Sequence, residues 1–106
     1  MQAFAALGDP TRQRIVEMLA ARELSSGEIA RRFDMTAPAV SQHLKLLREA
    51  GLIQVRRDAQ RRIYALDPAG LAELDAWLAR FRRFWSGRLD ALEHELDRPD
   101  HRRTAR

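Results

Sequence analysis

Apolar side chains recur at three- and four-residue steps along the first third of the chain, which predicts two short helices there. The first begins at Asp9-Pro10, since an acidic N-cap followed by proline is a typical helix start, and runs to about Arg22. The second begins at Ser25, which has capping-box spacing to Glu28. The inward-facing side chains of these segments are Ile15, Val16, Met18, Leu19, Ile29, Ala30 and Phe33.

A third helix is predicted within residues 36–53, and its two faces differ. Thr36 is a suitable N-cap, Pro38 falls in the first turn, and Gly51 can end the helix in a left-handed conformation. One face carries Val40, Leu44 and Leu47, and the other carries Ala37, Pro38, Ser41, Gln42, Lys45 and Arg48, with His43 at the boundary. Such a polar face suits a DNA major groove, because slim side chains permit entry, glutamine reads base edges and cations contact phosphate. An ordinary amphipathic surface helix is the alternative.

Two β-rich runs follow, at residues 52–55 and 63–66, and they predict a hairpin. Asp58-Ala59-Gln60 is a poor two-residue turn, so we expect a longer or flexible loop. Arginine pairs flank the tip, at Arg56-Arg57 and Arg61-Arg62. A basic hairpin after two helices joined by a tight turn is typical of a wing that contacts the DNA backbone. The same charges could also protect an edge strand from aggregation, and the two roles are compatible.

A long helix is predicted from Asp67-Pro68 to about Asp97, with more apolar surface than a lone exposed helix carries. We expect part of it to pack on its own domain and the rest on a second copy, helped by the short apolar segment 1–7. Ser86-Gly87 is a weak helix pair that could kink or divide it. The predicted dimer contacts are Phe4, Leu7, Leu74, Trp77, Leu78, Phe81, Trp85, Leu89 and Leu92.

Composition limits the classes of function that need to be considered. The 106 residues predict one domain at 1–97 and a basic, disordered tail at 98–106. Residues 36–66 hold six basic and two acidic side chains, so the net charge of +4 concentrates where DNA contacts are expected. The chain has no cysteine, no long apolar run and no apparent secretory signal, so we expect a cytoplasmic protein without disulfide, thiolate metal site or membrane partner.

Four segments carry most of the predicted elements: LGDPTRQRIVEML (7–19), ELSSGEIARRF (23–33), AVSQHLKLLREAGLI (39–53) and VRRDAQRRIYAL (55–66). These segments and their order resemble the ArsR family of winged helix-turn-helix repressors. The resemblance implies a mainly α fold with a small β-hairpin, dimeric through its first and last helices, and a homodimer bound to a palindromic double-stranded DNA operator. The predicted DNA contacts are Thr36, Pro38, Ala39, Ser41, Gln42, His43, Lys45, Arg56, Arg57, Arg61 and Arg62.

Departures from the family pattern favour its non-metal-sensing members. Metal sensors of this family place cysteines where this chain has residues 23–27, and serine is a poor substitute for thiolate. Asp90 and His94 lie one turn apart, and His101 lies in the tail, which does not reproduce the other metal pattern. We therefore expect no metal and no cofactor, and the sequence identifies no inducer.

Three alternatives remain open from the sequence. A ligand- or metal-responsive sensor of the same fold is the second hypothesis, with Trp77, Phe81, Phe84 and Trp85 as a possible pocket lining. An enzyme is disfavoured, because Ser41 and His43 are too close on one helix for a nucleophile–base pair and no phosphate-binding or cofactor motif is present. A protein-binding module explains the long apolar helix but not the charge at 36–66.

Overall fold

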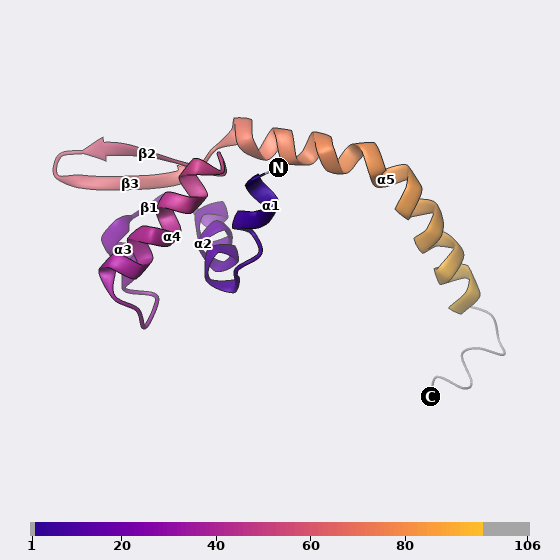
Figure 1. Ribbon diagram of the computed structural model, residues 1–106, viewed down its shortest axis with the longest axis horizontal. Helices are drawn as coiled ribbons and strands as arrows, with labels where there is room; N and C mark the ends of the chain where they lie inside the picture. The colour runs from indigo at the N-terminus through magenta and orange to yellow at the C-terminus, as the bar shows by residue number, and fades with distance from the viewer. Residues whose placement is uncertain (1, 97–106) are drawn as a thin grey trace. The chain divides into compact units, whose positions relative to one another are not determined.

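A computed structural model describes residues 2–96, which divide into two compact units with the boundary between Leu74 and Asp75. The elements are α1 (Gln2–Ala6), α2 (Pro10–Ala21), β1 (Leu24–Ser25), α3 (Ser26–Ala30), α4 (Ala37–Glu49), β2 (Ile53–Asp58), β3 (Arg61–Leu66) and α5 (Pro68–Leu96) (Figure 1). The mainly helical fold with a small antiparallel sheet confirms the predicted fold class. The predicted tail at 98–106 and His101 lie outside the described residues.

The helix starts follow the capping signals. Asp9 accepts a hydrogen bond from the Arg12 backbone N–H at 3.1 Å. Ser25 and Glu28 form the reciprocal capping box, because the Ser25 hydroxyl accepts from the Glu28 N–H at 3.1 Å and the Glu28 carboxylate accepts from the Ser25 N–H at 2.8 Å. Thr36 caps α4 through the N–H of its third residue. These bonds satisfy amides that would otherwise lack a partner at the start of each helix.

The sheet differs from the expected hairpin in two respects. It has three antiparallel strands in the order β1-β3-β2, since Leu24 pairs with Tyr64 and Ser25 with Ile63. The expectation of a long loop was wrong: β2 and β3 continue through the arginines to the pair Asp58–Arg61, leaving only Ala59-Gln60 as the turn. Ala59 makes this possible by adopting φ 58°, a conformation that alanine rarely takes.

The core of the first unit joins the helices to the base of the sheet. Its large buried side chains come from both the helices and the sheet, and they include Ile15, Leu19, Leu24, Ile29, Leu44, Leu47, Leu52, Ile53 and Tyr64. The inward residues predicted for α4, namely Val40, Leu44 and Leu47, are all buried, which fixes the rotation of that helix. Gly51, at φ 79°, ends the α4 segment and turns the chain into β2.

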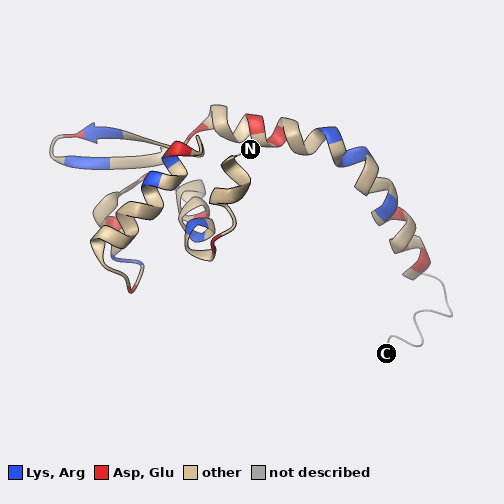
Figure 2. Ribbon diagram, viewed as in Figure 1, with Lys and Arg blue, Asp and Glu red and all other residues tan. Residues whose placement is uncertain are grey.

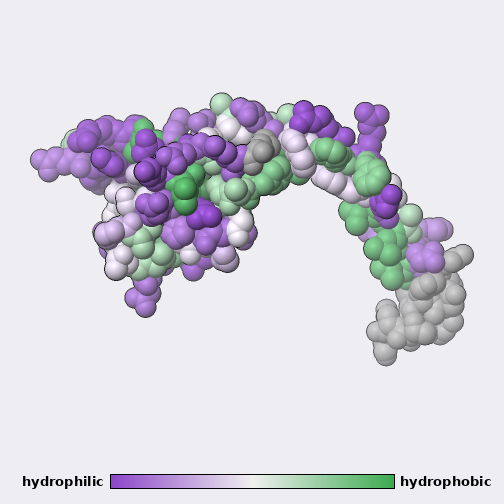
Figure 3. Space-filling view, viewed as in Figure 1, coloured by the Kyte–Doolittle hydropathy of each residue, from purple (hydrophilic) through white to green (hydrophobic). Residues whose placement is uncertain are grey.

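Helix α5 begins at Pro68, as predicted, and Leu71 and Leu74 pack against the core of the first unit. The helix is continuous through Ser86-Gly87, so the considered break does not occur. In the second unit no described side chain of α5 is buried, and Phe84, Leu89, Leu92 and Leu96 are all more than half exposed. Figure 3 shows apolar side chains gathered along this segment.

Candidate nucleic-acid interface

Helix α4 presents a polar face to solvent opposite its buried side. Because Val40, Leu44 and Leu47 point into the core, Ser41, Gln42 and Lys45 are exposed. At the N-terminal end the small residues Thr36, Ala37 and Pro38 are exposed, whereas Ala39 is half-buried. The helix therefore offers a slim leading end, then an amide, then a cation, in the order that major-groove binding requires.

His43 lies on the side of α4 that faces α2, and the structure places it away from the exposed polar face. Its Nδ1 lies 3.2 Å from the Arg12 guanidinium and 3.8 Å from the Asp9 carboxylate, and the ring is half-buried. Because arginine can only donate, the Arg12 contact is a hydrogen bond when the imidazole is neutral and carries its proton on Nε2. The position of His43 favours a packing role for the ring over base recognition.

The guanidinium of Arg12, near the start of α2, makes its contacts within the first unit. Its Nε donates to the Ala6 carbonyl at 2.6 Å, at the C-terminal end of α1, and its other nitrogen contacts His43 on α4. The backbone N–H of Arg12 also lowers the pKa of Asp9, with a smaller contribution from nearby His43. Arg12 thus links α1 and α2 to α4, which is the candidate reading helix, the one expected to enter the DNA major groove.

The wing is formed by β2 and β3, and the alternation of side chains along the strands separates its arginines into two faces. Val55 pairs with Tyr64 and Arg57 with Arg62, so these arginines extend the face that is buried at the base of the sheet. Arg56 belongs to the opposite face, where it donates to the Glu23 carboxylate at 2.6 Å. Figure 2 shows the basic residues along both strands.

Arg57 and Arg62 form a like-charged pair directly across the hairpin. Both are exposed, and neither side chain has an ion pair or hydrogen bond within residues 2–96. Like charges opposite each other repel, so the free hairpin is less stable than one with a neutral pair. An anion held between them would relieve that repulsion, which makes this pair the better phosphate candidate of the four wing arginines.

The remaining wing arginine, Arg61, lies near an acidic side chain. It is the cross-strand partner of Asp58, and together with Arg22 it helps to lower the pKa of Glu28. The largest cause of that lowered pKa is the Ser25 backbone N–H that donates to the Glu28 carboxylate. Part of the Arg61 charge is therefore balanced within the protein, unlike that of Arg57 and Arg62.

A cleft joins the reading helix to the wing. It has a volume of about 260 Å³, and its lining includes Ala37 and Ser41 from α4 together with Arg62 and Tyr64 from β3. An adjoining polar cleft brings Arg31 beside Arg61 and Arg62. Arg31 was not among the predicted contacts, and only the fold brings it to the wing. The two clefts make the exposed face of α4 and the basic face of the wing neighbours, as a surface that follows one DNA strand requires.

The predicted dimer contacts lie on exposed or half-buried surface. Phe4 and Phe81 are 40% and 41% exposed, whereas Leu7 and Leu74 are half-buried and pack partly on the core of their own chain. The rings of Trp77 and Phe81 contact each other at a tilt of 47°, with centroids 4.6 Å apart. Within residues 2–96 no helix is long and apolar enough to cross a membrane, and no three metal-ligating side chains gather.

A capped helix pair with an exposed polar second helix, followed by a basic hairpin, defines a winged helix-turn-helix DNA-binding protein. A family model described as a helix-turn-helix domain matches residues 7–56. The chain is 46% identical to the HTH-type transcriptional regulator Rv2034 of Mycobacterium tuberculosis over 91% of this chain and 87% of that protein. It is 33% identical to the transcriptional repressor SdpR of Bacillus subtilis over 74% of this chain and 87% of that protein.

A solved structure supports the same assignment. The crystal structure of an ArsR family transcriptional regulator matches with a TM-score of 0.73 at 29% identity, covering 80% of this chain and 93% of that one. The chain therefore belongs to the ArsR family of winged helix-turn-helix regulators, as the sequence motifs had indicated. It is a DNA-binding regulator of transcription and not an enzyme.

Proposed function

We propose that the protein is a homodimeric repressor that binds a palindromic double-stranded DNA operator. Helix α4 enters the major groove, and the wing follows the adjacent backbone. The observation that carries this proposal is the exposed face of Ser41, Gln42 and Lys45, together with a cleft that Ser41 shares with Arg62. Arg62 is the cross-strand partner of the other unpaired cation, Arg57. The first group supplies base contacts and the second supplies phosphate contacts.

The dimer uses the apolar stripe of α5 together with α1. Leu89 and Leu92 are 58% and 54% exposed, and Leu78, Trp85 and Phe81 recur at three- and four-residue steps on the same side of the helix. A contiguous apolar surface of this length is typical of an interface. With a twofold axis between two copies, the α4 helices reach major-groove segments about one helical turn apart.

The direction of regulation is proposed from one relative, because SdpR is named a transcriptional repressor. A repressor of this kind covers promoter DNA and blocks transcription while bound. A ligand-responsive form of the same activity is the second candidate, and a cavity of about 540 Å³ between α1 and α4 favours it.

Selection of bound sequences from random DNA, followed by footprinting on the selected site, tests the proposal. We expect an inverted repeat with two protected segments about 10 base pairs apart, and a dimer mass in solution by sedimentation equilibrium. Leu89→Asp should yield a monomer with greatly weakened operator binding, whereas Gly87→Ala, about half a turn from the stripe, should remain dimeric. A wild-type monomer that protects a single unrepeated segment would refute the dimeric operator complex.

A further inference from the structure

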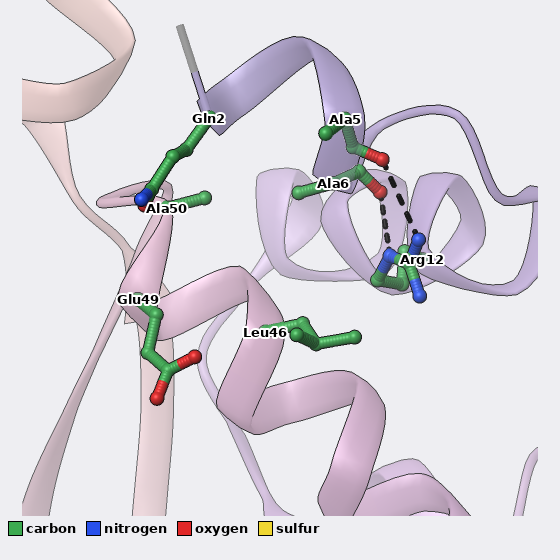
Figure 4. A pocket seen from close by; sticks show the side chains of 7 residues that line it. All are labelled: Gln2, Ala5, Ala6, Arg12, Leu46, Glu49 and Ala50. Atoms are coloured by element: carbon green, nitrogen blue, oxygen red, sulfur yellow. Dashed lines mark hydrogen bonds between the residues drawn. The ribbon is translucent and has the colours of Figure 1, made fainter.

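An apolar recess in the first unit lies between α1 and the C-terminal half of α4. Figure 4 shows Ala5 and Ala6 of α1 facing Leu46 and Ala50 of α4, with Arg12 at one end of the cavity and Glu49 at the other. Its volume of about 540 Å³ falls within the range of small-molecule sites. Leu46 is 37% exposed, although it is a large apolar side chain on a helix that otherwise buries its leucines.

Arg12 retains donor capacity at the edge of this cavity. An arginine has five N–H groups. Within residues 2–96, the Nε donates to Ala6, one terminal nitrogen contacts His43, and the other reaches the Ala5 carbonyl only at 3.5 Å. That last distance is at the outer limit of a hydrogen bond, so it contributes little. A carboxylate at this end would gain charge-assisted hydrogen bonds from the terminal nitrogens.

The end of the cavity opposite Arg12 carries hydrogen-bond acceptors. Glu49 is exposed and has no ion pair within the described part of the chain, and the side chain of Gln2 also lines the cavity, near Ala50. A hydroxyl or amine group on a ligand would donate to either of them. We propose that this cavity binds a small aromatic or branched organic acid, with its carboxylate at Arg12, its apolar body against Leu46 and the two alanines, and a donor group at Glu49.

The candidate dimer contact on α1 faces away from the proposed site. At 100° per residue, Phe4 lies 200° around α1 from both Gln2 and Ala6, so it projects from the side opposite the cavity. The candidate dimer contact and the cavity therefore use different sides of the same short helix. This separation favours a small ligand over a second copy of the chain as the occupant.

A ligand bound in this cavity affects the candidate DNA-binding face of α4 in two ways. Arg12 is the residue that contacts His43 on α4, so a carboxylate that draws the guanidinium into the cavity weakens that contact. In addition, Gln42, Leu46 and Glu49 lie at steps of four and three residues on one stripe of α4, which places the ligand on the same side of the helix as Gln42, about one turn further along. We expect ligand binding to weaken DNA binding. This coupling rests on the proposed function, whereas the binding site does not.

The binding test uses the full-length protein without DNA, with 4-hydroxybenzoate as the probe and 4-hydroxybenzyl alcohol as the control that lacks the carboxylate. Titration followed by amide NMR should give saturable shifts at Ala5, Ala6, Leu46 and Ala50 with the acid, and at least tenfold weaker binding of the alcohol. Leu46→Trp, which fills the cavity, should abolish the shifts, whereas Leu96→Trp, at another exposed leucine, should preserve them. Absence of saturable shifts with the acid, or equal binding to both tryptophan variants, overturns the site.

Two further measurements distinguish ligand binding in the cavity from its effect on DNA binding. Sedimentation of Leu46→Trp should give the wild-type mass, and a loss of the dimer would instead assign the cavity to contact between copies and overturn the proposal. Operator binding measured with saturating acid should weaken at least fivefold, and operator DNA should weaken acid binding by the same factor, since coupling is reciprocal. Saturable binding without this effect leaves the site in place but overturns the coupling to DNA, and it leaves the proposed operator binding untouched.

Discussion

The Arg56 guanidinium lies 2.6 Å from the Glu23 carboxylate, whereas Arg57, the next residue along β2, has no ion pair within residues 2–96. These adjacent arginines carry equal charge, but only the Arg57 guanidinium is free to contact a DNA phosphate without first giving up an ion pair. Arg57→Ala should weaken binding to operator and random DNA alike and reduce the slope of log affinity against log salt by about 1, the value for one lost phosphate contact. Fluorescence anisotropy across a salt series measures both quantities.

Arg56→Ala provides the matched control, because it removes the same charge from the same strand. Its effect on the salt slope should be clearly smaller than that of Arg57→Ala, and loss of the exposed ion pair should change stability by about 1 kcal/mol at most. Equal changes in slope for the two variants would contradict the assignment of the phosphate contact to the Arg57 face of the wing.

Gly70 permits the start of α5 to pass against the turn that ends α4. A Cβ at this position would collide with the Gly51 carbonyl oxygen, whereas a Cβ at Gly87, later in the same helix, would meet no atom. Gly70→Ala should therefore destabilise the fold by about 1–3 kcal/mol, as overpacking does. Gly87→Ala should instead stabilise it by about 0.5–1 kcal/mol, because alanine favours helix more than glycine. Urea unfolding of both variants checks the contrast, and similar losses of stability would contradict it.

The elements determined by neighbouring residues were predictable from the sequence. The caps at Asp9, Ser25 and Thr36 act on amides three residues away, and the buried side of α4 follows from its apolar spacing. Local rules therefore gave the order and starts of these helices. The apolar stripe of α5 was equally visible, although nothing within residues 2–96 covers its second half.

Features that depend on distant residues were not predictable in this way. Glu23 and Arg56 are 33 residues apart, and Arg12 and His43 are 31 apart, so only the fold brings each pair together. The strand β1 is two residues long and exists because β3 supplies its partners. The turn at Ala59 contradicts local preference, since pairing along both strands outweighs the left-handed backbone of one alanine.

The capping carboxylate of Glu28 gives stability a defined pH dependence. Its pKa is lowered from 4.5 in the folded protein, chiefly by the Ser25 backbone N–H, so the unfolded chain binds the proton more readily. The resulting stabilisation is fully present above about pH 4.5 and is lost as the pH falls through the lowered pKa. Glu28→Gln should therefore be less stable than wild type at pH 6, and the difference should shrink between pH 5 and pH 3 in urea unfolding. A difference that stays constant over this range would argue against the capping carboxylate as its source.

Gln42 and His43 are neighbours on α4, but their side chains have different surroundings. Substituting each by alanine should therefore affect a different property of the protein. Gln42 is exposed on the polar face, and a bidentate contact with adenine contributes about 1–3 kcal/mol of discrimination. Gln42→Ala should reduce operator affinity by that amount with little effect on random DNA or on stability. His43→Ala removes a half-buried ring that contacts Arg12, so its principal effect should be on the free energy of unfolding.

Parallel measurements on the two variants distinguish base recognition from packing. Anisotropy titrations with operator and random DNA give the specificity ratio, and thermal unfolding gives the stability of each protein. The ratio should fall for Gln42→Ala and remain near the wild-type value for folded His43→Ala. If His43→Ala instead lowers the ratio while Gln42→Ala leaves it unchanged, the side of α4 that faces α2 reads the bases, and the rotation of the reading helix proposed here is wrong.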